Sequence, residues 1–184
     1  MSRYRPPAKP STALITAGGF EVLQKELKAL WVRRKGVTEA VTAAAAEGDR
    51  SENAEYIYRK KELREIDRRI RYLQKRLAVL KVVREPPSDL TKIFFGALIH
   101  LSDEHGNEST VRIVGPDEID PSKHWISVDS IVARALLKQE EGDEVTVDAP
   151  GGKTVYIVES VSYCLLYTSP SPRDLSTSRM PSSA

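Results

Sequence analysis

The 184-residue sequence predicts an α+β protein, made of an N-terminal antiparallel helical hairpin of the coiled-coil type and a small C-terminal α+β domain. Apolar residues recur at steps of three and four over two long stretches, which is the spacing of a coiled-coil seam. A glycine-containing break separates the two stretches. From Ile93 onward, short alternating segments divided by Gly and Pro turns predict strands instead.

The first predicted helix begins near Thr16 and carries an apolar stripe that only Arg34 interrupts. The second helix has a matching stripe, and we expect Pro86 and Pro87 to stop it. Each helix should hold about 27 to 30 residues and measure about 40 Å. The stripes consist of Phe20, Leu23, Leu27, Leu30, Val37, Val41 and Ala44, and of Leu63, Ile66, Ile70, Leu73, Leu77 and Leu80.

A single helix cannot bury such a stripe by itself, so residues 14–86 are expected to form one hairpin. A homodimeric coiled coil is the structural alternative. The break centred on Gly48 favours a chain that folds back on itself, and hence a monomer.

The segment 48–56 connects the two helices and places Asp49 and Glu52 at the tip of the hairpin. Their spacing of three is that of a capping box, with Asp49 as N-cap and Glu52 at the third helical position. The alternative is a chemical role at a tip that reaches into another macromolecule. Two carboxylates are too few to hold Mg²⁺ tightly, so a stand-alone nuclease is not expected. A working tip would complete an active site held elsewhere.

The second predicted helix is strongly basic, although the formal net charge of the chain is only +2. From Arg59 to Arg84 the sequence has eleven basic residues and three acidic ones. Charge at this density predicts binding to nucleic acid or to an acidic protein surface. A solvated helix face is the alternative interpretation.

Several other classes of protein do not fit this sequence. It has no apolar run long enough for a membrane span, and residues 1–10 lack the apolar core of a signal peptide. We therefore expect a soluble, cytoplasmic protein with no membrane partner. Cys164 is the only cysteine, so neither a disulfide nor a zinc site is predicted. His100, His105 and His124 are scattered and are interpreted as surface residues.

After a linker at 87–92, residues 93–163 predict a domain of about 70 residues. Its short helix should begin after Ser130 as N-cap and direct Val132, Ala135 and Leu136 toward the core. The remaining predicted elements are a hairpin at 97–101 and 110–114, a strand at 125–128, and a hairpin at 145–147 and 155–158. We expect disorder in the basic tail 1–13 and in residues 164–184, which resemble a cloning or read-through extension.

Several motifs of this chain occur together, in the same order, in one known family. The segment 48–56 (GDRSENAEY) resembles the tip signature of the bacterial Gre transcript-cleavage factors. The segments 60–73, 94–97, 112–119 and 133–138 resemble one branch of that family more specifically. The resemblance extends over residues 14–163.

This resemblance implies a coiled-coil domain that enters the secondary channel of bacterial RNA polymerase, and an FKBP-like domain that docks at the channel rim. Backtracked polymerase extrudes the 3′ end of the nascent RNA into that channel. The factor then stimulates the polymerase's own active site to cut the RNA. It is therefore not an enzyme by itself and has no cofactor of its own. The FKBP-like fold does not imply isomerase activity.

The resemblance also implies roles for individual residues. Asp49 would help to hold a Mg²⁺ ion that is shared with the polymerase, and Glu52 would orient or activate the attacking water. The basic helix would contact the extruded RNA, with Arg59, Lys60 and Arg64 as the candidates nearest the tip.

In the C-terminal domain, Asp129 and Ser130 are implied as contacts with the polymerase. The chain departs from the family at the next position, where Ile131 replaces a usual proline. This change frees the backbone and adds a hydrogen-bond donor.

Two other functions compete with cleavage stimulation. A regulator could occupy the same channel without promoting cleavage, but it would not need Asp49 and Glu52 at this spacing. A coiled-coil chaperone or adaptor would be expected to have apolar rather than acidic arm ends.

Overall fold

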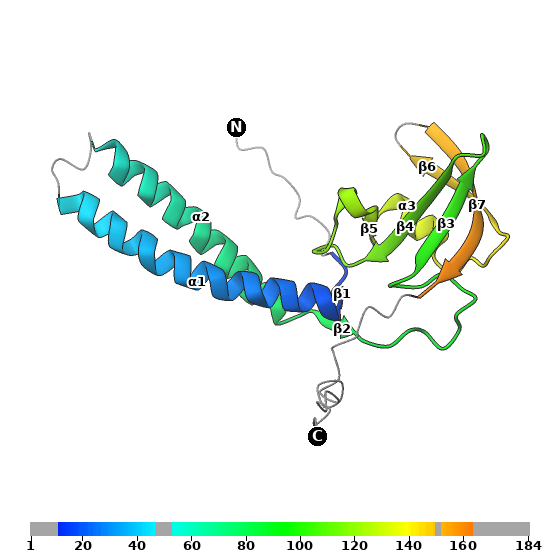
Figure 1. Ribbon diagram of the computed structural model, residues 1–184, viewed down its shortest axis with the longest axis horizontal. Coiled ribbons are helices and arrows are strands. Elements are labelled where there is room, and N and C mark those ends of the chain that lie inside the picture. Colours follow the sequence, from blue (N-terminus) through cyan, green and yellow to red (C-terminus); the bar gives the residue numbers. More distant parts are fainter. Residues whose placement is uncertain (1–10, 47–52, 150–151, 164–184) are drawn as a thin grey trace, which may run out of the picture.

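A long two-helix hairpin projects from a compact sheet domain (Figure 1). This computed structural model describes residues 11–46, 53–149 and 152–163. Helix α1 (Ala17–Ala46) runs outward and α2 (Ala54–Leu77) returns beside it. The helical hairpin followed by an α+β domain confirms the predicted fold class. Within the described residues, neither helix is long and apolar enough to cross a membrane.

The apolar stripes of α1 and α2 meet along the length of the hairpin. Near the sheet domain, Leu23 and Leu73 are buried together with Ile15. Farther out, Val37 packs with Ile66 and Ile70. The seam predicted from the sequence is thus buried within one chain.

The interrupting Arg34 lies at the edge of this seam, where its Nε is 2.6 Å from Asp67 Oδ1 on the other helix. The break in the apolar stripe is therefore compensated by an ion pair between the two helices.

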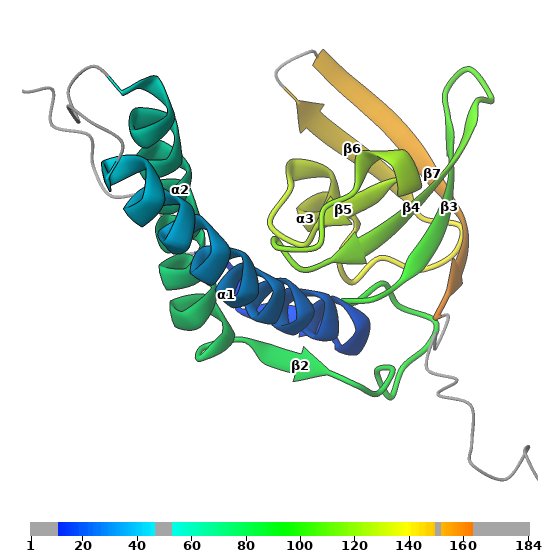
Figure 2. The same cartoon turned by 60° about the vertical axis from the view of Figure 1, so that its left-hand side comes forward.

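The expectation that α2 continues to Pro86 is wrong, because the helix ends at Leu77 and Ala78 is its C-cap. The chain then forms β2 (Lys81–Val83), which pairs in parallel with β1 (Leu14–Thr16). Figure 1 labels both strands at the base of the hairpin, and Figure 2 shows β2 there from another side. The β-branched Val82 and Val83 favour this extended conformation. At 24 residues, α2 is also shorter than expected.

The sheet domain has five strands in the order β5-β4-β3-β7-β6. Only β4 and β5 pair in parallel, and the other neighbours are antiparallel. The strands are β3 (Leu98–Asp103), β4 (Glu108–Val114), β5 (Trp125–Ser127), β6 (Glu144–Ala149) and β7 (Gly152–Ser162), with a 3-10 turn η1 (Pro121–Lys123) before β5.

One short helix, α3 (Ile131–Leu136), packs on the sheet. The predicted N-cap is confirmed, because the Ser130 hydroxyl accepts a hydrogen bond from the Ala133 N–H at 3.1 Å. Ala133 and Leu136 are fully buried, whereas Val132 and Ala135 are only partly buried. The sequence therefore predicted the helix and the burial of Leu136, but it did not predict the burial of Ala133.

Polar contacts hold the hairpin against the sheet domain. Arg76 of α2 forms an almost buried ion pair with Asp117 at 2.7 Å. At the start of α1, the buried Glu118 accepts hydrogen bonds from the Thr16 N–H and hydroxyl. A Cβ on Gly19 would lie 2.1 Å from the Glu118 carboxylate, so any larger residue here would have to displace this hydrogen-bonded side chain.

Candidate functional site

The end of the hairpin remote from the sheet domain is defined by Asn53. The Asn53 side-chain oxygen accepts a hydrogen bond from the Tyr56 N–H at 3.0 Å, which makes Asn53 the N-cap of α2. Its amide nitrogen donates to the Ala44 carbonyl of α1 at 2.9 Å. One side chain therefore both starts the second helix and ties it to the end of the first.

The predicted tip carboxylates, Asp49 and Glu52, lie outside the described residues. The capping-box interpretation of this pair is nevertheless wrong, because α2 starts at Ala54 and its N-cap is Asn53. Glu55 does occupy the first turn of α2, where a negative charge interacts favourably with the helix dipole.

Sequence reasoning missed the role of Asn53. A signal was present, because Asn is among the preferred N-cap residues and an acidic residue follows it in the first turn. Asp49 satisfies the same pattern four residues earlier, so composition alone could not choose between the two positions.

The three predicted RNA contacts have different surroundings. Arg59 lies between two carboxylates, 3.5 Å from Glu55 and 3.4 Å from Glu62. Its positive charge is therefore partly neutralised by carboxylates of the same helix. The ion pairs with Arg33 and Arg59 hold the pKa of Glu62 below its ordinary value, with Arg33 as the largest cause. Lys60 donates a long hydrogen bond, 3.4 Å, to the Tyr56 hydroxyl, and its Nζ lies 5.2 Å from the centroid of the same ring.

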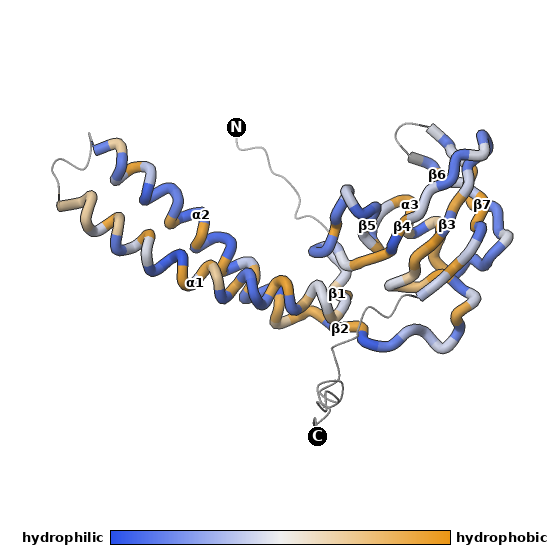
Figure 3. Tube along the Cα trace, viewed as in Figure 1, coloured by the Kyte–Doolittle hydropathy of each residue, from blue (hydrophilic) through white to orange (hydrophobic). Residues whose placement is uncertain are grey.

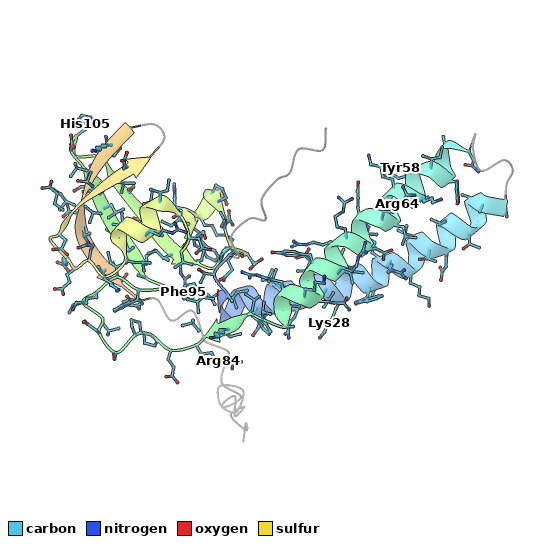
Figure 4. The ribbon with its side chains drawn as sticks, turned by 180° about the vertical axis from the view of Figure 1, so that it is seen from behind. Lys28, Tyr58, Arg64, Arg84, Phe95 and His105 are labelled. Atoms are coloured by element: carbon cyan, nitrogen blue, oxygen red, sulfur yellow. The ribbon has the colours of Figure 1, made fainter. Side chains whose placement is uncertain are left out.

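Arg64 belongs to an exposed basic face of α2. Figure 3 shows α2 as largely hydrophilic, and Figure 4 shows Arg64 on the outer edge of the hairpin, with Lys28 of α1 on the opposite edge. Within the described residues, the members of this face pair with no carboxylate. They are Lys61, Arg64, Arg68, Arg71 and Lys75.

The predicted polymerase contacts lie near the junction of the two domains. Asp129 accepts hydrogen bonds from the Thr12 N–H at 2.8 Å and from the Thr12 hydroxyl at 2.5 Å. These hydrogen bonds hold the pKa of Asp129 below its ordinary value. Ser130 caps α3, and Ile131 follows it as an exposed first helical residue.

The described residues contain no group of three or more His, Cys, Asp and Glu side chains that could hold a metal ion. The one carboxylate that the resemblance assigns to a metal, Asp49, lies outside the described residues.

Comparison with known proteins identifies the family to which the chain belongs. Residues 13–82 match the family described as "Transcription elongation factor, N-terminal", and residues 87–163 match "Transcription elongation factor, GreA/GreB, C-term". The chain belongs to the GreA/GreB family of transcription elongation factors. A transcription elongation factor acts with RNA polymerase, which is therefore its partner.

Two curated relatives are named transcription elongation factor GreB. The protein of Xanthomonas axonopodis pv. citri is 56% identical over 168 residues, which are 90% of this chain and 100% of that protein. The protein of Pseudomonas aeruginosa is 54% identical over 164 residues, covering 89% of this chain and 98% of the relative. GreB is the branch of the family that the motifs from Lys60 onward resemble, so this resemblance is confirmed.

Among solved structures, a crystal structure of the GreA factor homolog 1 protein of Thermus thermophilus matches 82% of this chain and 98% of its own, with 24% identity and a TM-score of 0.39.

Proposed function

We propose that this protein inserts its helical hairpin into the secondary channel of RNA polymerase and stimulates cleavage of the 3′ end of backtracked RNA. Such cleavage rescues arrested transcription complexes. The observation that carries the proposal is the end of the hairpin. Helix α1 ends at Ala46 and α2 begins at Ala54, far from the sheet domain, and the segment joining them contains Asp49 and Glu52.

The finding that Asn53 caps α2 supports a chemical role for the two carboxylates. If Asp49 were the N-cap, helix formation alone would explain its presence. Since Asn53 performs this task, the start of the helix does not require Asp49 or Glu52.

We further propose that Asp49 shares a Mg²⁺ ion with the polymerase and that Glu52 orients or activates the attacking water. The donor chemistry is consistent with a shared ion, since Mg²⁺ prefers oxygen ligands and is usually held by one or two carboxylates plus other partners. The bond cleavage itself belongs to the polymerase, and this chain supplies charge and a proton acceptor at the end of a rigid arm.

The other predicted contacts fit the same function. Lys60 and Arg64 lie on the basic part of α2 that follows the tip, where they can bind phosphates of the extruded RNA. Asp129 and Ser130 are proposed to dock the sheet domain at the channel rim. The hairpin buries its apolar seam within one chain, which favours action as a monomer alongside the cytoplasmic transcription machinery.

The experiment is to add the purified protein to a stalled, backtracked polymerase complex and to follow the transcript length. The proposal expects shortened transcripts, and no cleavage of RNA by the protein alone. A protein that binds the complex but leaves the transcripts intact would be a non-cleaving channel regulator, and the proposal would be wrong.

A further inference from the structure

A groove with a volume of about 390 Å³ lies on the hairpin, between α1 and α2. Its lining is formed by Trp31, Arg34, Asp67, Ile70, Arg71 and Gln74. The volume is within the range of sites that hold one small organic group. The groove is remote from the tip and contains none of the residues assigned above to cleavage.

Trp31 gives the groove an oriented and accessible aromatic face. Its residue exposure is 46%, so the ring is not part of the buried seam. The guanidinium of Arg34 lies over the ring at 5.7 Å from the ring centroid, and Asp67 fixes Arg34 through the 2.6 Å ion pair. The indole is therefore held in place from one side, while much of its surface remains open to a ligand.

Arg71 adds a cation beside this aromatic face. Its Nε donates to the Asp67 backbone carbonyl at 3.2 Å, which orients the guanidinium. Within the described residues no carboxylate pairs with Arg71, so its terminal nitrogens remain available to an anion. Gln74, one turn farther along α2, adds a side chain with both a donor and an acceptor.

A line of basic residues connects the tip to this groove. Lys60, Arg64 and Arg71 are spaced by four and seven residues, so they follow one face of α2. From Asn53 to Arg71 the helix rises about 27 Å. This distance corresponds to about eight stacked nucleotides, and to fewer when the strand is extended.

We propose that this groove is a binding subsite for one base of single-stranded RNA. The base stacks on Trp31, an adjacent phosphate binds Arg71, and Gln74 hydrogen-bonds a base edge. An aromatic face next to unpaired cations is the arrangement by which proteins bind single strands without sequence preference. The source of the RNA, namely a long extrusion from backtracked polymerase, rests on the function proposed above.

The first test needs no polymerase, so it does not depend on the proposed function. The sequence has two tryptophans, and Trp125→Phe leaves Trp31 as the only indole emitter. Titration of the full-length variant with a single-stranded oligoribonucleotide at low salt should quench the Trp31 emission. Adding Arg71→Ala should weaken the apparent affinity several-fold, and a duplex RNA of the same sequence should quench far less. Absence of quenching by the single strand would overturn the subsite.

The second test uses the length of the extruded RNA. Trp31→Ala should lower the apparent affinity about tenfold on complexes with about ten extruded nucleotides, the loss expected for one stacked base. With about two extruded nucleotides, which cannot reach the groove, the variant should match wild type. Trp31→Phe, which keeps an aromatic ring, should retain most of the wild-type affinity on the complexes with long extruded RNA. The matched control is Val32→Ala, the next residue of α1, which is 76% exposed and outside the groove.

An equal loss on both complexes would show that Trp31 contacts the polymerase protein instead, and the RNA subsite would be rejected. No loss on either complex would also reject it. Wild-type protein on the short complex reports separately on cleavage stimulation, so failure of the proposed function is distinguishable from failure of the subsite. Melting curves of each variant show whether the hairpin is intact.

Discussion

At the scale of single residues, Arg76 joins three parts of the molecule. It pairs with Asp117 of the sheet domain at 2.7 Å, and it donates to the Thr12 carbonyl at 2.7 Å. The Tyr72 hydroxyl donates to the same Asp117 carboxylate, which raises the pKa of Tyr72. Asp117 and Arg76 are 7% and 11% exposed, so neither can exchange its partner for water at little cost.

Asp117→Ala should therefore destabilise the protein strongly. Removing one member of a buried ion pair leaves an uncompensated charge and typically costs about 3 to 5 kcal/mol. The measurement is the free energy of unfolding by urea. The matched control is Glu140→Ala, which breaks an exposed pair with Lys92 and should change stability little. Equal effects of the two substitutions would show that the Arg76 pair does not hold the domains together.

The contact between Thr12 and Asp129 should make stability depend on acid pH. Hydrogen bonds from Thr12 depress the pKa of Asp129 in the folded protein, whereas the unfolded value is about 3.9. The contribution is thus fully present above about pH 5 and is lost as pH falls through the folded pKa.

Wild-type protein should lose unfolding free energy more steeply between about pH 5 and about pH 3 than Asp129→Asn, which cannot titrate. Urea unfolding across this pH series provides the measurement. Parallel curves for the two proteins would contradict the depressed pKa.

At the scale of elements, the start of α2 depends on one side chain with two partners. Asn53→Ala removes both the cap of α2 and the link to the Ala44 carbonyl, and it should cost about 0.5 to 2 kcal/mol. Asn53→Asp keeps the accepting oxygen but loses the donor to Ala44, so it should fall between wild type and the alanine variant. Thermal unfolding and amide exchange in the first turn of α2 measure the effect. Identical behaviour of both variants would mean that the link between the helices contributes nothing.

The basic residues of α2 that are predicted to contact RNA should act through charge. Replacing Lys60 and Arg64 by alanine should weaken action on complexes with long extruded RNA, and added salt should mimic the defect. Each lost phosphate contact should lower the slope of log affinity against log salt by about one. Arg59→Ala is the informative comparison, since Glu55 and Glu62 already engage its charge, and its effect should be smaller. An unchanged salt slope in the Lys60 and Arg64 variant would identify these residues as a solvated helix face.

At the scale of the whole molecule, the hairpin could be predicted because its buried seam repeats along the sequence. The same repeat misled the prediction of where α2 ends. Leu80 keeps the spacing and packs into the same cluster as Leu73, yet it lies beyond the helix. Apolar spacing reports which residues are buried and does not by itself show that the chain is still helical.

The junction of the two domains could not be predicted from such patterns. Its contacts are polar and join residues far apart in the sequence, such as Thr16 with Glu118 and Thr12 with Asp129, which are separated by 102 and 117 positions. No local periodicity marks pairs of this kind. The proposed RNA subsite was missed for a similar reason, because Trp31 and Arg71 approach each other only when the hairpin closes.

The central claim is that the tip carboxylates act chemically rather than structurally. Asp49→Asn and Glu52→Gln keep the size and hydrogen-bonding shape of the side chains but remove their charge. Because Asn53 is the N-cap of α2, neither change should affect helix stability.

The most direct measurement is the cleavage rate of backtracked complexes at saturating protein, combined with competition against the wild-type protein for polymerase binding. Both variants should compete as well as wild type and yet stimulate cleavage about 10² to 10⁴-fold less, the usual loss for a catalytic acid or base. If Asp49→Asn bound normally and cleaved at the wild-type rate, the proposed role of the tip would be wrong.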